Sequence, residues 1–445
     1  MVYYALTAIS FLIASVTCDP LILTPLIKNN RTSEALSASR VNYSPFGKIV
    51  SYSGFLTVNE KFNSNMFFWF FQSENDYRND PVILWLQGGP GASSLIALFV
   101  ENGPFKISSN NSVEFRQESW TKNHSVLYID NPVGSGFSFT KDDAGFVRDG
   151  NSTGADIYEA LVQFFKLFPE LRKNKFFIAG ESYAGKYVPA IGHVILEKNP
   201  KAQVPIYLAG VIIGDGFCDP VNQMYYDEFL YQIGLIDLNG KTQFREVEEK
   251  IISLIKNERW REAFDSFDQL INGDLSPSTL FRNLTGFTSV YNYLVPDGTA
   301  VLVELARVSR YLQSQNVRNA LHVGNSSFNI VNSTVEVRLL NDYMKSVAHW
   351  LTELLDNVQV LIYNGQVDTI FPYPLVEDYL RQLTFKDVQS YKNAKREIWL
   401  VDNEVAGYKK RAGKFTEALV RNAGHVSIRD QSKWVLDLVK NFTHS

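Results

Sequence analysis

Cysteine is scarce in this chain, because its 445 residues include only Cys18 and Cys218. Two cysteines cannot form a disulfide framework or a cysteine zinc site. The six histidines are scattered, and no HExxH pattern places two of them on one helix face. We therefore predict no metal and no cofactor, and we expect Cys218 to be a buried free thiol.

An excess of positive charge is also missing. Lysine and arginine total 43 against 47 aspartates and glutamates, a net charge of −4, so the chain could not neutralise the phosphates of a nucleic acid. Hydrophobic residues make up 45% and charged residues 20%, which excludes global disorder. The length suits one large α/β domain with an insertion, or two domains.

Long apolar runs are absent as well. The most apolar segment, residues 1–18, is too short to span a bilayer comfortably and ends in small residues. This pattern indicates a secretory signal peptide, with a membrane anchor or a buried first strand as the alternatives. No later run suits a membrane span, and the C-terminus carries no retention signal.

Sites for N-linked glycans are dense. Such a density favours a chain that passes through the secretory pathway, where glycans occupy surface loops. We predict a secreted protein or one held in an acidic, lysosome-like compartment, and a homodimer is left open. The asparagines that begin an Asn-x-Ser/Thr sequon are Asn30, Asn42, Asn110, Asn123, Asn151, Asn283, Asn325, Asn332 and Asn441.

Several short apolar runs end in turns rich in glycine or asparagine, and they are 81–86, 126–129, 175–179, 208–213 and 358–363. Continuous apolar strands that alternate with helical patterns indicate a mostly parallel sheet covered on both faces. The stretch from 215 to 340 differs, and residues 247–271 have helical spacing. We predict an α/β core over 19–214 and 341–445, interrupted by a mainly helical insertion, or cap, over 215–340.

The segment Gly180-Glu181-Ser182-Tyr183-Ala184-Gly185 follows one of these apolar runs and precedes a predicted helix, 186–196. A nucleophilic serine on a sharp strand-to-helix turn needs small neighbours. The N–H groups at the start of the next helix favour a developing oxyanion. An ordinary tight turn is the alternative, but the strand at 176–179 favours Ser182 as a nucleophile.

A serine hydroxyl is a poor nucleophile until a base removes its proton. Of the six histidines, His425 fits this role, because it lies in a small-residue turn after the apolar run 418–420. Asp368 follows the run 358–363 and could orient the imidazole, with a helix N-cap as its alternative role. The order Ser182, Asp368, His425 is that of α/β-hydrolases, so we predict an α/β-hydrolase fold.

Ordered motifs extend through nearly all of the chain after residue 18. On these motifs the chain resembles the serine carboxypeptidase family, and within it the vitellogenic-like carboxypeptidase branch. They are WLQGGPGASSL (85–95), ENGP (101–104), DNPVGSGFS (130–138), GESYAGKYVPAIG (180–192), IGDG (213–216), VRNALHV (317–323), YNGQVD (363–368), VAGY (405–408) and AGH (423–425).

The resemblance implies a role for each matching residue. Ser182 would be the nucleophile, His425 the general base and acid, and Asp368 the orienting acid. The backbone N–H groups of Gly89 and Tyr183 would form the oxyanion hole. A glycine-rich loop and the residue after the nucleophile are where such donors are expected.

The resemblance also implies a site for the free C-terminal carboxylate of a substrate. It maps onto Gln87, the backbone of Gly88, Glu101 and Glu181, with Trp85 nearby. Because like charges at close range raise at least one pKa, we expect the tightest binding at acidic pH. The alternatives are a helix-dipole role for Glu181 and a solvated helix face for Glu101.

These residues predict a serine-type carboxypeptidase that releases C-terminal residues from peptides through an acyl-enzyme. An esterase or acyltransferase and a non-catalytic secreted homologue are the alternatives. Three positions depart from the usual family pattern: Gln87 replaces asparagine, Ala92 replaces cysteine, and Val426 follows His425 without the usual proline beyond it. The disulfides of relatives are therefore not expected, and the leaving-residue pocket is left unassigned.

Overall fold

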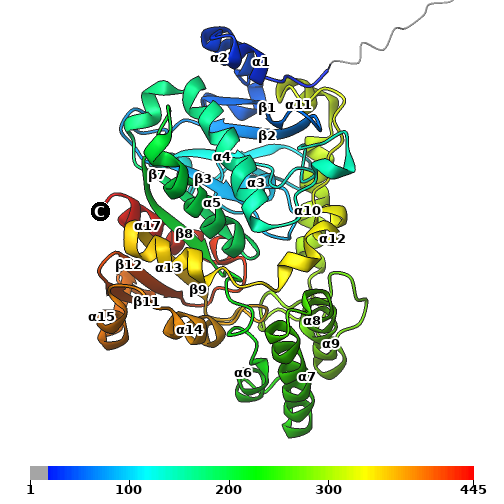
Figure 1. Cartoon of the computed structure of the whole chain (residues 1–445). Helices are drawn as coiled ribbons and strands as arrows, with labels where there is room; N and C mark the ends of the chain where they lie inside the picture. Colours follow the sequence, from blue (N-terminus) through cyan, green and yellow to red (C-terminus); the bar gives the residue numbers. More distant parts are fainter. Residues whose placement is uncertain (1–18) are drawn as a thin grey trace, which may run out of the picture.

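One ten-stranded sheet forms the centre of the computed structural model, which describes residues 19–445 (Figure 1). The predicted signal peptide and Cys18 lie outside these residues. Along the sheet the strands are β1 (Ser51–Asn59), β2 (Ser64–Phe71), β6 (Ser125–Ile129), β3 (Val82–Leu86), β7 (Phe176–Glu181), β8 (Leu208–Gly214), β9 (Gln359–Gly365), β12 (Phe415–Val420), β11 (Glu404–Ala412) and β10 (Glu397–Val401). A separate hairpin pairs β4 (Phe105–Ile107) with β5 (Val113–Phe115).

The six middle strands, from β6 to β12, are all parallel, and an antiparallel pair closes each edge of the sheet. The predicted mostly parallel sheet is therefore confirmed. In a parallel sheet the carboxyl ends of the strands share one edge, which is where α/β proteins place their ligands. The ends of β3, β7, β8, β9 and β12 thus bring five distant segments together.

Helices cover both faces of the sheet (Figure 1). On one face lie α4 (Gly150–Leu167), α5 (Ala184–Lys198) and α13 (Ala348–Asn357), and on the other lie α3 (Leu95–Val100) and α17 (Ser432–Thr443). Strand residues alternate between the two cores, as Leu84 and Trp85 do. The remaining short helices are α1 (Thr24–Lys28), α2 (Thr32–Ser39), α14 (Tyr373–Gln382), α15 (Val388–Asn393) and α16 (Ser427–Asp430).

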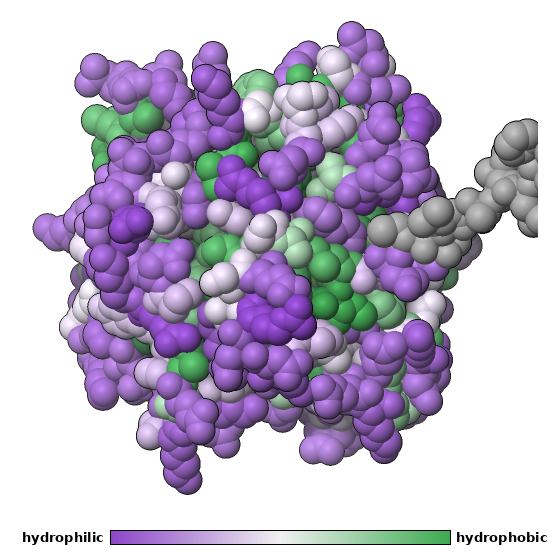
Figure 2. All heavy atoms as spheres, turned by 90° about the horizontal axis from the view of Figure 1, so that it is seen from above, coloured by the Kyte–Doolittle hydropathy of each residue, from purple (hydrophilic) through white to green (hydrophobic). Residues whose placement is uncertain are grey.

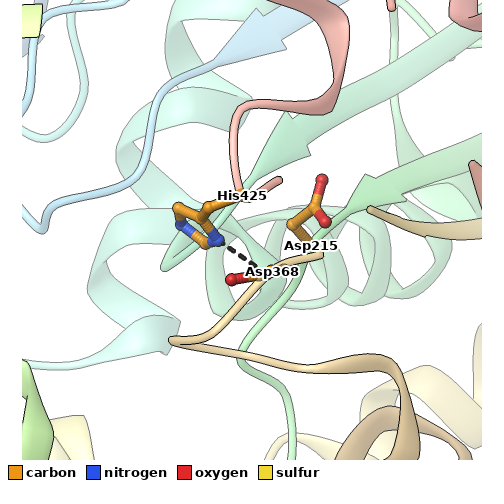
Figure 3. A group of neighbouring side chains, drawn as sticks. All are labelled: Asp215, Asp368 and His425. Carbon is orange, nitrogen blue, oxygen red and sulfur yellow. Dashed lines mark hydrogen bonds and ion pairs between the residues drawn. The ribbon is translucent and has the colours of Figure 1, made fainter. Parts of the chain in front are cut away.

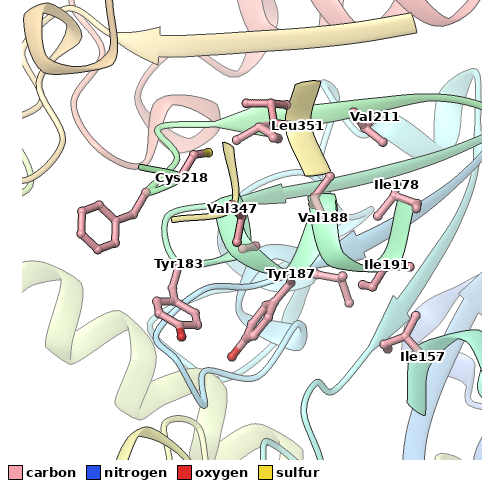
Figure 4. Close-up of a cluster of buried hydrophobic side chains, with 14 of the residues drawn as sticks. Ile157, Ile178, Tyr183, Tyr187, Val188, Ile191, Val211, Cys218, Val347 and Leu351 are labelled. Atoms are coloured by element: carbon pink, nitrogen blue, oxygen red, sulfur yellow. The ribbon is translucent and has the colours of Figure 1, made fainter. Parts of the chain in front are cut away.

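Helix α5 is buried on all sides over residues 184–192 (Figure 4). Tyr187, Val188 and Ile191 are at most 1% exposed and pack in the core shared with strand β7 and α13. The helix starts two residues earlier than predicted, because Ala184 and Gly185 complete its first turn. Cys218 lies beside it as a buried free thiol, as predicted, and its Sγ donates to the carbonyl of Gly185 at 3.2 Å.

Between β8 and β9 the chain forms helices. They are α6 (Tyr226–Gln232), α7 (Leu238–Lys256), α8 (Trp260–Phe267), the π-helical turn η6 (Asp268–Asn272), α9 (Leu280–Thr285), α10 (Thr299–Leu312), α11 (Gln315–Ala320), α12 (Ser333–Tyr343) and α13. In Figure 1, α6 to α9 extend beyond the sheet. The helical spacing over 247–271 belongs to α7, α8 and the π-helical turn η6, because Glu258 adopts a φ of 56° between α7 and α8 and ends the first.

Hydrophilic side chains cover most of the face seen in Figure 2, with small apolar patches between them. Within residues 19–445, no helix has both the length and the apolar character that crossing a membrane requires.

Candidate active site

The turn that carries Ser182 joins β7 to α5 at the carboxyl edge of the sheet. Ser182 adopts a φ of 60°, in the left-handed region that a non-glycine residue rarely occupies. Its N–H donates to the carbonyl of Gly214 at 3.1 Å, and its own carbonyl accepts from the N–H of Phe217 at 3.1 Å. The end of β8 therefore holds the strained backbone, as a nucleophile elbow requires.

His425 follows β12 and meets Asp368, which follows β9 (Figure 3). Nδ1 of His425 lies 2.9 Å from Oδ2 of Asp368, and both side chains are at most 5% exposed. Because the carboxylate accepts the Nδ1 proton, Nε2 is left as the basic nitrogen. Oδ1 of Asp368 accepts from the N–H groups of Ile370 at 2.9 Å and Phe371 at 3.3 Å, which fixes the carboxylate.

Two aromatic rings enclose the imidazole of His425. Tyr291, from the segment between α9 and α10, stacks on it with ring centroids 5.3 Å apart and planes at 13°. The carbonyl of Tyr291 accepts the backbone N–H of His425 at 2.6 Å. Phe371 contacts the ring edge-on, with centroids 5.5 Å apart. The helical segment thus helps to place the imidazole.

The glycine-rich loop after β3 lies directly against the Ser182 turn. A Cβ on Gly88 would come within 2.7 Å of the nitrogen of Tyr183 and 2.8 Å of the Cβ of Ser182, so only glycine fits there. Gly89 adopts a φ of 107°, which also favours glycine. Within residues 19–445, the N–H groups of Gly89 and Tyr183 donate to no protein acceptor. Both are available to a ligand beside Ser182.

Trp85, Gln87 and Glu181 form a chain of hydrogen bonds in the floor of the same site. Nε1 of Trp85 donates to Oε1 of Gln87 at 3.1 Å, and Nε2 of Gln87 donates to Oε1 of Glu181 at 2.8 Å. The indole thereby sets the orientation of the Gln87 amide. Oε2 of Glu181 is buried and has no hydrogen-bond partner among the described residues.

Glu101, at the end of α3, is only 1% exposed. The alternative of a solvated helix face for Glu101 is therefore wrong. Neither carboxyl oxygen has a hydrogen-bond partner within residues 19–445.

Burial raises the pKa of Glu101 to about 8, although the charges of Arg116 and Arg429 oppose the rise. Burial and the charge of Glu101 raise the pKa of Glu181 well above its ordinary value. Neutral acids with free oxygens suit a carboxylate ligand.

The structure brings most of the predicted site residues to one edge of the sheet. Asp368 and His425 are in contact, and Gly88 and Glu181 adjoin Ser182. The hydroxyl of Ser182 forms no hydrogen bond with His425 or with any other described residue. Catalytic hydrogen bonds are often long before substrate binds.

For two neighbours of His425, Tyr291 and Asp215, the sequence predicts no role. Tyr291 has no motif that would reveal it. Asp215 does have a signal, because it directly follows the apolar run 208–213 within the quoted IGDG motif. An acid at the end of a parallel strand reaches the same edge as the ends of its neighbours.

The sequon asparagines differ in exposure. Seven are exposed, whereas Asn123 and Asn332 are partly buried. The amide of Asn332 is engaged, because Nδ2 donates to the carbonyl of Gly134 at 2.8 Å and Oδ1 caps α12 by accepting from the N–H of Thr334 at 3.0 Å.

Comparison with known families matches residues 44–445 to the family described as serine carboxypeptidase. The chain is 49% identical to the venom serine carboxypeptidase of Apis mellifera, covering 96% of this chain and 91% of the relative. It is 44% identical to the vitellogenic carboxypeptidase of Aedes aegypti and 44% identical to the probable serine carboxypeptidase CPVL of Homo sapiens, in both cases over 96% of this chain and 90% of the relative.

Among solved structures, the chain is similar to Kex1(delta)p of Saccharomyces cerevisiae, a prohormone-processing carboxypeptidase. The TM-score is 0.80 at 24% identity, and the match covers 92% of this chain and 96% of that one. This likeness confirms the predicted α/β-hydrolase fold.

Proposed function

This chain belongs to the serine carboxypeptidase family and is a serine-type carboxypeptidase, and from that premise we propose which of its residues remove the C-terminal residue of a peptide. Ser182 attacks the scissile carbonyl while Nε2 of His425 accepts the hydroxyl proton. The single observation that carries these roles is the 2.9 Å contact of His425 with Asp368, beside the strained Ser182 turn.

The tetrahedral oxyanion accepts hydrogen bonds from the N–H groups of Gly89 and Tyr183. His425 then gives the proton to the leaving amine, so the peptide C–N bond breaks and the C-terminal residue departs. Water attacks the resulting ester of Ser182, with His425 again acting as base and then as acid. Asp368 keeps the imidazole in the correct tautomer and stabilises its charged form.

Specificity for a free C-terminus comes from Gln87, Glu101 and Glu181, with the backbone of Gly88. When the two acids are protonated, they can donate hydrogen bonds to a substrate carboxylate, as can the Gln87 amide. The support for this role is burial of the three side chains, at most 8% exposed, together with carboxyl oxygens that have no hydrogen-bond partner among residues 19–445, both of Glu101 and Oε2 of Glu181.

We expect this site to make substrate binding depend on pH. The pKa of Glu101 is raised to about 8, so its neutral form is present at acidic pH and is lost as the pH rises through about 8. The KM for a peptide with a free C-terminus should then rise at least about tenfold, because juxtaposed like charges cost several kcal/mol. The same peptide as its C-terminal amide should show no such rise. Steady-state kinetics of both peptides across pH measure this.

Glu101→Gln is the matched control, because its amide stays neutral at every pH. The alkaline rise in KM should be reduced in this variant. Fastest release of the C-terminal residue at a pH above about 8, or equal turnover of the acid and the amide, would contradict the proposed carboxylate site. Equal turnover would favour the esterase or acyltransferase alternative.

The helical insertion over 215–340 is proposed to be a cap that helps to build the site. Tyr291 of this segment stacks on His425, and its carbonyl accepts the backbone N–H of His425 at 2.6 Å. Residues 19–214 and 341–445 would then be the two parts of the α/β-hydrolase core.

We also propose that the protein enters the secretory pathway and is either secreted or held in an acidic compartment. Residues 1–18 resemble a signal peptide, seven sequons are exposed, and a similar protein is named as a venom enzyme.

Glycan mapping of protein expressed through this pathway should find glycans at the exposed sequons but not at Asn332. A glycosylated Nδ2 would have to leave the carbonyl of Gly134, to which it donates. Mass spectrometry after enzymatic glycan removal measures the occupancy. Asn332→Gln should leave the glycan mass unchanged, whereas a glycan on Asn332 of folded protein would contradict the expectation.

A further inference from the structure

A second buried aspartate lies beside the His425–Asp368 pair (Figure 3). Asp215 directly follows β8 and is 0% exposed. Its carboxylate, the carboxylate of Asp368 and a ring nitrogen of His425 all lie within 4.8 Å of one another. The mechanism described above does not use this acid.

Backbone and side-chain hydrogen bonds join Asp215 to the end of β9, from which the Asp368 turn begins. Its N–H donates to the carbonyl of Tyr363 at 2.8 Å. Its Oδ1 accepts from the N–H of Gly365 at 2.6 Å and from Nδ2 of Asn364 at 3.4 Å. Its φ is 47°, a left-handed conformation that costs about 1–3 kcal/mol for a residue other than glycine.

The same network continues to the turn that holds the Asp368 carboxylate. Nδ2 of Asn364 also donates to the carbonyl of Phe371 at 2.8 Å. The N–H of Phe371 in turn donates to Oδ1 of Asp368. The Asp215 carboxyl is therefore joined, through two residues, to the group that orients His425.

The surroundings of Asp215 disfavour a second negative charge. From the turn after β9 it faces the carboxylate of Asp368, and from the segment after β12 it faces His425 and the carboxylate of Asp430. The N–H of Gly365 and the hydroxyl of Ser427 favour the charged form, but burial and the neighbouring acids outweigh them. Glu181, at the end of β7, adds a further acid nearby. None of the ion pairs among residues 19–445 supplies a lysine or arginine partner to Asp215, and its Oδ2 has no hydrogen-bond partner there. Burial and the charge of Asp368 raise the pKa of Asp215 well above its ordinary value.

We propose that Asp215 is a positioning residue for the reaction and acts as a neutral acid, with Oδ1 holding the end of β9 and its proton shared with the carboxylate of Asp368. Two carboxyl groups this close in a buried site cannot both ionise without strong repulsion. A shared proton leaves a single negative charge on the two carboxyl groups beside His425. The Asp368 turn can then keep its position next to Asp215. This inference rests on the roles proposed for Asp368 and His425.

Asp215→Asn tests the neutral state, because the amide has the same shape and cannot ionise. A fluorophosphonate probe labels the serine without needing the substrate carboxylate site, so its rate reports Ser182 and His425 alone. At acidic pH the variant should label as fast as the wild type. As the pH rises through the raised pKa of Asp215, labelling of the wild type should slow, whereas labelling of the variant should persist.

Asp215→Ala tests the positioning role, because it removes the acceptor for Gly365 and the partner of Asp368. A misplaced catalytic group can cost about 10²-fold, so the kcat should fall by about that factor with little change in KM. The asparagine variant should restore the kcat at acidic pH. The inference would be overturned if the labelling rates of the wild type and Asp215→Asn had superimposable pH profiles. It would also be overturned if Asp215→Asn folded but was not labelled. Failure of the wild type itself to label would instead reject the roles proposed for Ser182 and His425.

Discussion

Ser182→Ala is expected to lower the kcat for release of a C-terminal residue by about 10⁶-fold, the scale on which a serine hydrolase loses turnover without its nucleophile. No other described hydroxyl is proposed to attack the substrate, so an acyl-enzyme could not form. Residual turnover would come only from the oxyanion donors and substrate binding. Steady-state kinetics with an N-blocked dipeptide measure the loss.

The substitution should leave the fold intact. The Ser182 hydroxyl makes no hydrogen bond within residues 19–445, so its removal breaks none. Because alanine keeps the Cβ, the steric strain of the backbone at a φ of 60° is unchanged. The midpoint of thermal unfolding should stay close to that of the wild type. Ser253→Ala, at an exposed position on α7, is a matched control and should retain full kcat. A folded Ser182→Ala protein with wild-type kcat would refute the proposed nucleophile.

Asp368→Asn is expected to lower the kcat by about 10⁴-fold. The amide oxygen can still accept from the N–H groups of Ile370 and Phe371, so the turn should keep its shape. The amide nitrogen would then face Nδ1 of His425 and donate to it. Nε2 would carry the proton instead, and the imidazole could not accept the proton of Ser182.

Asp356→Asn is the matched control for this loss. Asp356 also accepts a backbone N–H, that of Lys386 at 2.8 Å, in a solvent-exposed hydrogen bond outside the site. Its substitution should leave the kcat unchanged. If Asp368→Asn folds and retains most of the wild-type kcat, then Asp368 does not set the tautomer of His425, and the proposed role is wrong.

The sequence predicts the strands β3, β6, β7, β8 and β9 because they are apolar runs that end in turns rich in glycine or asparagine, whereas it does not predict the antiparallel edge strands β1, β2, β10 and β11. Those turns place Ser182, Asp368 and His425 at strand ends, and the parallel arrangement brings those ends together. Local patterns could not show burial that depends on distant packing. Glu101 follows an apolar helix and resembles a solvated residue in sequence, yet it is only 1% exposed.

The contacts of the helical insertion were likewise beyond local patterns. Helical spacing predicts an amphipathic helix, but it does not say which residue between two helices reaches His425, as Tyr291 does. Nor does it show the interruption at Glu258, where a single left-handed residue separates α7 from α8. Asp215 was visible as a strand-end acid, but its proximity to Asp368 depends on the pairing of β8 with β9.

The long separation between β8 and β9 has a consequence for biosynthesis. During synthesis the Ser182 turn leaves the ribosome well before the segments that carry Asp368 and His425. Strand β12, which lies between β9 and β11, leaves the ribosome after the five other parallel strands, so the parallel part of the sheet is completed by this strand. With the roles proposed for Ser182 and His425, a nascent polypeptide that lacks β12 therefore holds its serine without a base, and hydrolytic capability arises only when this strand and the His425 turn after it are in place.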